Sequence, residues 1–340
     1  MIRSFLLACA LAAPVPAAAG PAGPVGLADL AVPAPHHDRT IEAVVWYPAA
    51  PAAAAPAEAW GGNAVFHGHA VHRDAAPAGP DAPVVLLSHG LGGNLRGLGW
   101  LAHGLAARGA VVVALDHPGS TTRDLDPARS LDHGTRARDL SAALNALGAD
   151  PRFADRTGGP VTAAGFSLGG WTALSLGGLR GDLAGYAAHC DAVGGGSTHC
   201  ADIAGWGIDL HALDASRWDG DHADPRVTRV AAIDPGLVWG LPDRGGLRAE
   251  TLLIALGDGP DRLLATDFDR SGLRALLPGA ATARVAPARH WSALPRCRPG
   301  GAAIVAAETD LPICDDPPGA DRAAIHARIV DLVAGLALRD

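Results

Sequence analysis

Short apolar runs alternate with amphipathic stretches along most of this chain. The runs are rich in β-branched residues, which is typical of parallel strands buried on both faces, and they cover residues 84–87, 111–115, 161–164, 227–233, 251–256 and 281–286. The stretches between them have a helical period at residues 98–107, 133–147, 168–176, 262–277 and 321–336. Strands that alternate with helices predict an α/β fold with a mostly parallel sheet and helices on both faces.

The flanking segments extend this pattern. Residues 41–47 predict a first strand, residues 63–72 its antiparallel partner, and the Ala/Pro-rich residues 48–59 a linker. Residues 180–226 interrupt the alternation with two cysteines and a weak helix near 209–217. We interpret this insertion as a cap over the functional site, the alternative being a surface excursion without catalytic consequence. The chain thus predicts one domain over residues 20–340.

The N-terminus predicts export. Arg3 precedes an apolar core over residues 5–13 and small residues that end at Gly20, which is typical of a signal peptide over residues 1–19, cut after Ala19. A lipid-attachment box at Cys9 is an alternative, but it would leave an apolar core that is too short. A buried N-terminal helix is another, disfavoured by Pro14 and Pro16. We expect a secreted or periplasmic protein.

Composition narrows the possible partners. The 340 residues carry a formal net charge of -8, and every cationic side chain is an arginine. Since no basic stripe is present, nucleic acid is not an expected partner. No later apolar run reaches the roughly 18 residues that a bilayer span needs. Oligomeric state is not readable from the sequence.

Four cysteines follow the predicted signal peptide. Cys190 and Cys200 form one local pair, and Cys297 and Cys314 form another, each within an irregular segment. In an oxidising compartment these pairs predict two disulfides. A zinc site that includes the neighbouring His189 and His199 is the alternative, although the C-x-x-C spacing typical of such sites is absent.

The motif that carries most chemical information is V-T-A-A-G-F-S-L-G-G at residues 161–170. A serine between glycines, where a strand passes into a helix, predicts a strained turn that exposes the hydroxyl. Ser167 is therefore the candidate nucleophile. The loop S-H-G-L-G-G-N at residues 88–94 follows an earlier strand, where α/β-hydrolases place one oxyanion donor. We expect the backbone N–H groups of Leu91 and Leu168 to be the two donors.

A base and an acid should follow the nucleophile in the chain. His290 stands after the last predicted strand and is the candidate base, whereas His326, on the C-terminal helix, is expected at the surface. Asp234 and Asp258 each end a predicted strand. Either carboxylate could orient the imidazole and stabilise its cation, so both stay open at this stage.

Together, S-H-G-L-G-G, D-H-P-G at residues 116–119, G-F-S-L-G-G and His290 resemble secreted platelet-activating-factor acetylhydrolases and bacterial proteins described as predicted dienelactone hydrolases. The resemblance covers residues 41–340 and implies an α/β-hydrolase fold, with Asp234 as the acid and Leu91 and Leu168 as oxyanion donors. Dienelactone hydrolases use a cysteine nucleophile, whereas this chain has Ser167. The long insertion also departs from the acetylhydrolase pattern.

The expected activity is that of a secreted serine carboxylic ester hydrolase that needs no cofactor or metal and acts on a small-molecule ester. An amidase or peptidase is the alternative among enzymes. A non-catalytic binding protein on a hydrolase scaffold is the alternative from another class.

Overall fold

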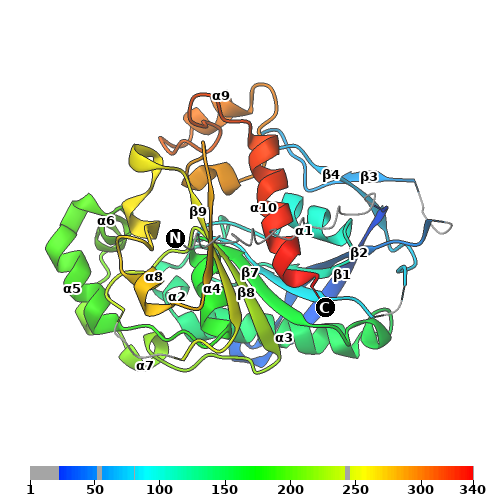
Figure 1. The fold of residues 1–340 in the computed structure, drawn as a ribbon, viewed down its shortest axis with the longest axis horizontal. Coiled ribbons are helices and arrows are strands. Elements are labelled where there is room, and N and C mark those ends of the chain that lie inside the picture. The colour runs from blue at the N-terminus through cyan, green and yellow to red at the C-terminus, as the bar shows by residue number, and fades with distance from the viewer. Residues whose placement is uncertain (1–22, 52–55, 80, 242–245, 340) are drawn as a thin grey trace, which may run out of the picture.

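The computed structural model describes residues 23–51, 56–79, 81–241 and 246–339, so the predicted signal peptide lies outside the described residues. Its strands form a 10-stranded sheet in the order β10-β9-β8-β7-β5-β6-β2-β1-β4-β3 (Figure 1). The parallel part consists of β5 (Val84–Ser88), β6 (Val111–Leu115), β7 (Val161–Phe166), β8 (Val227–Ile233), β9 (Glu250–Leu256) and β10 (Ala281–Val285). Each predicted β-branched run therefore forms one of these strands.

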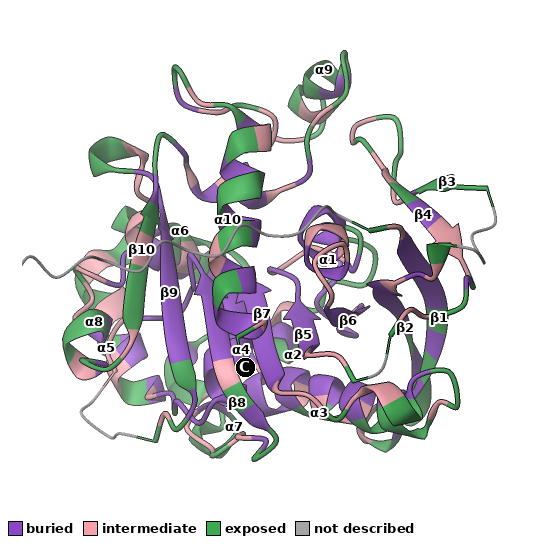
Figure 2. Ribbon diagram, turned by 45° about the vertical axis from the view of Figure 1, so that its right-hand side comes forward, coloured by how far each residue is buried: buried purple, intermediate pink, exposed green. Residues whose placement is uncertain are grey.

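Helices cover both faces of the sheet. On one face lie α1 (Gly99–Ala106) and α10 (Arg322–Ala337), and on the other α3 (His133–Ala149) and α4 (Leu168–Leu176) (Figure 1). Successive side chains of a strand point to opposite faces. Val84 and Leu86 accordingly join the core beneath α3 and α4, while Val85 and Leu87 join the core beneath α1 and α10. Figure 2 shows the central strands buried and the edge strand β10 more exposed.

The N-terminal end of the sheet differs from its prediction. A strand that sequence patterning missed, β1 (Val25–Ala34), precedes β2 (Arg39–Pro48) and is its antiparallel partner. Of the predicted strand 63–72, only residues 69–72 lie in a strand, β4 (His69–Arg73), which pairs in parallel with β1 and antiparallel with β3 (Glu58–Trp60). Alanine, glycine and proline make β1 a weak strand former, so its strand conformation depends on pairing with β2 and packing against α3.

One predicted helix is also wrong. Residues 262–277 contain a short 3₁₀ turn, Leu264–Thr266, and the four-residue α8 (Leu273–Leu276). Gly272, with a φ of 86°, interrupts the helical stretch. The side chains of Arg262 and Thr266 turn inward to the carboxylate of Asp234. These tertiary hydrogen bonds outweigh the helical period of the sequence.

The segment over residues 180–226, called the cap segment below, lies between α4 and β8. It contains α5 (Leu183–Val193), α6 (Thr198–Gly205) and α7 (Ala215–Trp218), and α5 and α6 lie at the left of Figure 1. The weak helix predicted near 209–217 is a 3₁₀ turn, Leu210–Ala212, followed by α7. Two further short helices are α2 (Pro127–Ser130) and α9 (Gly301–Ala306). In the described part of the chain, no helix combines the length and apolarity that crossing a bilayer requires.

Candidate functional site

Ser167 stands in a strained turn between β7 and α4. Its φ is 56° and its ψ is -121°, a conformation that residues with a Cβ rarely adopt. Glycine is required on both sides. A Cβ on Gly165 would lie 2.1 Å from the carbonyl oxygen of Gly169, and a Cβ on Gly169 would lie 2.0 Å from that of Ser88. The two glycines allow strand and helix to approach closely enough to form the turn predicted from the motif.

His290 and Asp234 form a hydrogen-bonded series with Ser167. His290 begins a 3₁₀ turn after β10, and its Nε2 lies 3.1 Å from Ser167 Oγ. Its Nδ1 lies 2.7 Å from Asp234 Oδ2. The carboxylate accepts the Nδ1–H group, which leaves the Nε2 lone pair facing the serine hydroxyl. In this tautomer His290 can accept the proton of Ser167.

Buried donors surround the Asp234 carboxylate. Besides His290, it accepts hydrogen bonds from Leu256 N–H at 3.1 Å, from Thr266 Oγ1 at 2.8 Å and from Arg262 Nη1. Burial alone would raise the pKa of Asp234, but the hydrogen bond and charge of His290 and the charge of Arg262 outweigh it and hold this pKa below its usual value. Asp234 therefore stays ionised beside the imidazole.

The structure separates the two acid candidates. Asp234 is fully buried at the end of β8. The side chain of Asp258 is 65% exposed and pairs with Arg284 Nη1 at 3.2 Å. Sequence reasoning placed both at strand ends and missed Arg262 and Thr266, because their role depends on a turn in a segment predicted to be helical.

The loop after β5 lies against Ser167. A Cβ added to Gly90 would stand 3.3 Å from Ser167 Cβ, so Leu91 follows a residue in contact with the candidate nucleophile. Among the described residues, no acceptor is found for the Leu91 N–H group. Leu168 is the first residue of α4, where helix geometry leaves N–H groups without a partner in the helix. Both N–H groups thus lie next to Ser167 in the chain or in space, without a backbone acceptor among the described residues.

A pocket of about 40 Å³ separates Ser167 from the cap segment. Its lining joins the site to α6 and consists of Leu91, Leu131, Ser167, Leu168, His199, Asp202, Ile203, Trp206, Gly236 and Leu237. Burial and, to a smaller extent, the charge of His290 lower the pKa of His199 to about 4. Nδ1 of His199 is buried with no hydrogen-bond partner among the described residues. Sequence reasoning considered His199 only as a zinc ligand beside Cys200.

Both cysteine pairs are disulfides in the structure. Cys190 bonds to Cys200 and so ties α5 to α6, while Cys297 bonds to Cys314 in the segment after His290. These are the two local pairs chosen from the sequence. Because both thiols of each pair are used in an S–S bond, neither pair has thiolates to offer a zinc ion.

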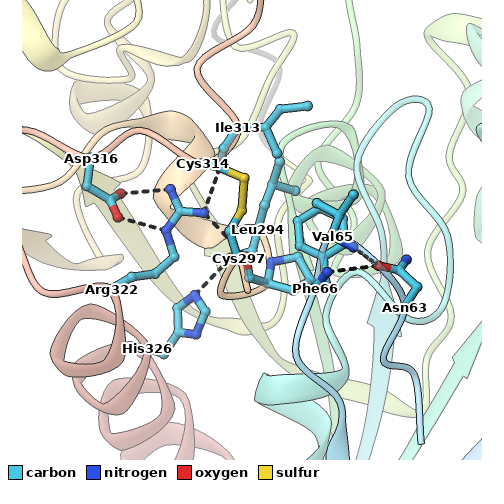
Figure 3. Close-up of a disulfide and its surroundings, with 11 residues drawn as sticks. Asn63, Val65, Phe66, Leu294, Cys297, Ile313, Cys314, Asp316, Arg322 and His326 are labelled. Atoms are coloured by element: carbon cyan, nitrogen blue, oxygen red, sulfur yellow. Dashed lines mark hydrogen bonds and ion pairs between the residues drawn. A yellow bond between two sulfur atoms is a disulfide. The ribbon is translucent and has the colours of Figure 1, made fainter. Parts of the chain in front are cut away.

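The Cys297–Cys314 loop borders a larger groove of about 690 Å³. The glycine-rich loop after β5 also lines this groove, with residues 92–94, 96 and 97. Figure 3 shows how the loop is held: Arg322 binds both carboxylate oxygens of Asp316 and the carbonyl oxygen of Ile313. Asp316 in turn accepts from Ser292 Oγ at 2.6 Å, in the 3₁₀ turn that begins at His290. The stapled loop thus supports the candidate base.

His326 corrects one expectation, since it is only 6% exposed. Its ring stacks on Trp100 with centroids 3.8 Å apart. Its Nε2 donates to the carbonyl oxygen of Ser292 at 3.0 Å and to that of Leu294 at 3.1 Å. Figure 3 shows His326 beside Leu294. The amphipathic pattern of α10 did not reveal that the turn after His290 covers this side of the helix.

One cluster in the described residues has metal-type ligands: His36, His37 and Asp139. Nε2 of His36 and Nε2 of His37 are hydrogen-bonded to the same oxygen, Asp139 Oδ1, at 2.7 and 2.8 Å. Arg129 Nη2 lies 3.0 Å from His37 Nδ1. Because the guanidinium can only donate, Nδ1 accepts and the His37 proton is on Nε2, facing Asp139. A metal ion would have to displace that proton and break these hydrogen bonds.

No family model matches this chain, and no curated protein matches it. The solved structure of a ferulic acid esterase from Streptomyces cinnamoneus is similar, with a TM-score of 0.57 and 19% identity over 94% of this chain and 90% of that one. A dienelactone hydrolase-like promiscuous phosphotriesterase, P91, from metagenomic libraries has a TM-score of 0.51 and 15% identity over 92% and 97%. At these identities the likeness establishes the fold: the chain has an α/β-hydrolase fold, as predicted.

Proposed function

We propose that this protein is a serine hydrolase that cleaves carboxylic esters through an acyl-enzyme. The observation that carries the proposal is the series Ser167–His290–Asp234, with Ser167 in a strained turn at the edge of a pocket. A serine, a histidine and an acid hydrogen-bonded in this way perform acyl transfer on several unrelated folds. The α/β-hydrolase fold supports this reading by analogy only.

The chemistry follows from the geometry. Ser167 Oγ attacks the ester carbonyl carbon while its proton passes to His290 Nε2, and Asp234 stabilises the resulting imidazolium. The N–H groups of Leu91 and Leu168 hold the negative charge of the tetrahedral intermediate. His290 then gives the proton to the leaving alcohol, and a water molecule repeats the sequence to release the acid. No step requires a cofactor or metal.

The substrate is proposed to be a small ester with an apolar acyl group. The pocket at Ser167 is small and lined by Leu91, Leu168, Ile203 and Leu237, so a short or flat acyl group fits it better than a long chain. A small-ester activity agrees with the resemblance to acetylhydrolases and dienelactone hydrolases. It agrees equally with a ferulic acid esterase as a structural neighbour.

The site of action is proposed to be outside the cytoplasm. Residues 1–19 have the pattern of a signal peptide. The two disulfides support an oxidising compartment, in which such bonds persist.

A panel of nitrophenyl esters of rising acyl length, combined with labelling by an active-site phosphonate, tests the proposal. We expect turnover that falls as the acyl chain lengthens, and a label on Ser167. Turnover of amides but not of esters would favour an amidase or peptidase. A protein that neither turns over esters nor takes the label would instead be a binding protein on a hydrolase scaffold.

A further inference from the structure

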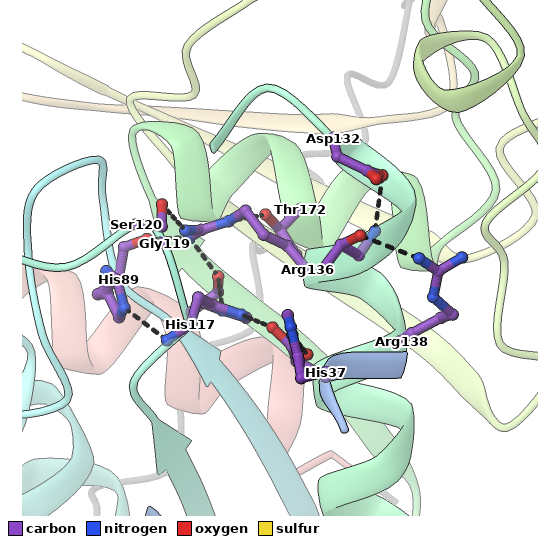
Figure 4. Close-up of polar contacts among 12 residues, drawn as sticks. His37, His89, His117, Gly119, Ser120, Asp132, Arg136, Arg138 and Thr172 are labelled. Atoms are coloured by element: carbon purple, nitrogen blue, oxygen red, sulfur yellow. Dashed lines mark hydrogen bonds and ion pairs between the residues drawn. The ribbon is translucent and has the colours of Figure 1, made fainter. Parts of the chain in front are cut away.

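A buried guanidinium lies behind the two candidate oxyanion donors. Arg136, on α3, is 2% exposed. Figure 4 shows its hydrogen bonds: Nε donates to Thr172 Oγ1 at 3.0 Å, Nη1 to Ser120 Oγ at 2.6 Å, and Nη2 to the carbonyl oxygen of His89 and to Ser88 Oγ. Burying a cation is unfavourable unless hydrogen bonds and a counter-charge compensate for the lost hydration. The guanidinium of Arg136 is buried but donates to four different acceptors, two of which are connected to the candidate oxyanion donors.

Hydrogen bonds made by His89 connect Arg136 to the peptide group of Leu91. The backbone N–H group of His117 donates to His89 Nε2 at 3.1 Å, so the ring proton of His89 is on Nδ1. That Nδ1–H group donates to the carbonyl oxygen of Gly90 at 2.7 Å. Because the Gly90–Leu91 peptide is planar and trans, fixing its carbonyl oxygen fixes the Leu91 N–H group in the opposite direction. Arg136 holds this unit in place through the carbonyl oxygen of His89.

Another bond leads to Leu168. Thr172 Oγ1 accepts from Arg136 Nε and donates to the carbonyl oxygen of Leu168 at 3.0 Å. Leu168 opens α4 directly after Ser167. One rigid, planar guanidinium thus connects the first turn of α4 with the loop after β5.

The charge of Arg136 has a buried counterpart on the next turn of α3. Asp139 is fully buried and accepts hydrogen bonds from His117 Nδ1 at 2.8 Å and from His36 and His37. Burial would raise the pKa of Asp139, but these hydrogen bonds outweigh it and hold this pKa well below its usual value. Burial lowers the pKa of Arg136 to about 9, and the charge of Asp139 opposes this shift, so Arg136 stays protonated as a fixed donor at neutral pH.

We propose that Arg136 is a positioning residue that aligns the Leu91 and Leu168 N–H groups into one oxyanion hole. It acts through His89 and Thr172 and does not touch the substrate. This inference rests on the proposed function, because the alignment matters only if an oxyanion forms at Ser167. A displacement of about 1 Å in such donors is expected to cost on the order of 10²-fold in rate.

The test compares Arg136→Met with Arg138→Met, a matched control on the same helix whose side chain is exposed. We expect kcat for a nitrophenyl ester, per site labelled by the phosphonate, to fall about 10²-fold in Arg136→Met with KM changed less than about threefold. Inhibition by a trifluoromethyl ketone, which forms an oxyanion on Ser167, should weaken by a similar factor. Arg138→Met should match the wild type. Arg136→Lys should lie between them, because it keeps the charge but lacks the fork of donors.

Thr172→Val is the second variant, and it tests the proposed positioning role if Arg136→Met does not fold. It removes the link to Leu168 while keeping the side-chain shape, and we expect a kcat loss of about tenfold with a parallel loss of ketone inhibition. Unchanged kcat and ketone inhibition in whichever of these variants folds would overturn the inference. Absence of ester turnover and labelling in the wild type would instead refute the proposed function.

Discussion

In the described part of the chain, a serine, a histidine and an aspartate are hydrogen-bonded in series at two places. One series lines a pocket with its serine, whereas the other is fully buried. In the first, Ser167 Oγ lies 3.1 Å from His290 Nε2, and His290 Nδ1 lies 2.7 Å from Asp234. In the second, Ser88 Oγ lies 2.9 Å from His117 Nε2, and His117 Nδ1 lies 2.8 Å from Asp139. The distances alone do not distinguish the two.

The surroundings of the serines distinguish them. Ser88 ends a regular strand, is fully buried and accepts a hydrogen bond from Arg136. Ser167 has a positive φ and lines a pocket. In the second series, burial and the charge of Arg136 lower the pKa of His117 to about 4. A base this weak is a poor acceptor for a serine proton at neutral pH. Backbone strain, access and free N–H donors therefore distinguish the candidate nucleophile from Ser88, whereas the order of the hydrogen bonds does not.

The largest expected difference is between the two serines. Ser167→Ala should lower ester turnover by several orders of magnitude, because nucleophile and base act as a unit. His290→Ala should do the same, and the double variant should be little worse than either. Ser88→Ala should keep turnover within about tenfold, since its hydroxyl faces Arg136 and His117 rather than a substrate. Rates on a nitrophenyl ester measure this. More than about a tenth of the wild-type rate in Ser167→Ala would contradict the assignment.

The next largest difference is expected between variants of three aspartates, in activity and in stability. Asp234→Asn removes the charge that stabilises the His290 imidazolium and favours the wrong tautomer, a change worth about 10⁴-fold in the serine protease example. Asp139→Asn should instead lower the free energy of unfolding by about 3 to 5 kcal/mol, because it leaves Arg136 without its buried anion. Asp258→Asn is the exposed control and should behave as wild type. Kinetics and urea unfolding separate the three variants. An inactive Asp258→Asn beside an active Asp234→Asn would reverse the choice of acid.

Loops closed by disulfides support the Ser167 series, whereas Ser88 and His117 stand at and after the ends of the central strands β5 and β6. Replacing Cys297 and Cys314 by serine should cost about 3 kcal/mol of stability. It should also lower kcat, since the loop holds the turn that begins at His290. Replacing Cys190 and Cys200 should alter the ratio of kcat/KM values between short and long acyl esters. Equal kinetic profiles for the two double variants would contradict this division of roles.

The stability of the protein should also depend on pH. Burial lowers the pKa of His117 to about 4, of His133 to about 3 and of His326 to about 4. Below the usual histidine pKa of about 6.5, the unfolded chain therefore binds protons that the folded chain does not. The free energy of unfolding should fall as pH drops from about 6.5 towards 4, by up to about 1.4 kcal/mol per pH unit for each histidine.

Urea midpoints at several pH values measure this dependence. His326→Gln should make it shallower, because it removes one of the buried histidines whose pKa is lowered. A stability that is constant from neutral pH to about pH 4 would show that these histidines are not kept neutral.

Local sequence determined much of the site. Short β-branched runs can be buried only between two layers of helices, which predicted the parallel strands. Gly165 and Gly169 are required where strand and helix touch, so the motif placed Ser167 in its turn. His290 followed from the order of elements along the chain. Each of these inferences depends on neighbours within a few residues or on chain order alone.

Tertiary structure decided the rest, because the deciding contacts join residues far apart in the chain. Asp234 and Asp258 have equivalent local surroundings, and only packing brings Asp234 to His290, 56 residues away. Pairing with β2 decided that β1 is a strand, and the turn after His290 decided that His326 is buried. In the sequence, Arg136 is one charged residue among others in a predicted helix. In the fold, the loops after β5 and β6 and helix α4 surround its guanidinium. Its burial, and hence its role, depends on those distant partners.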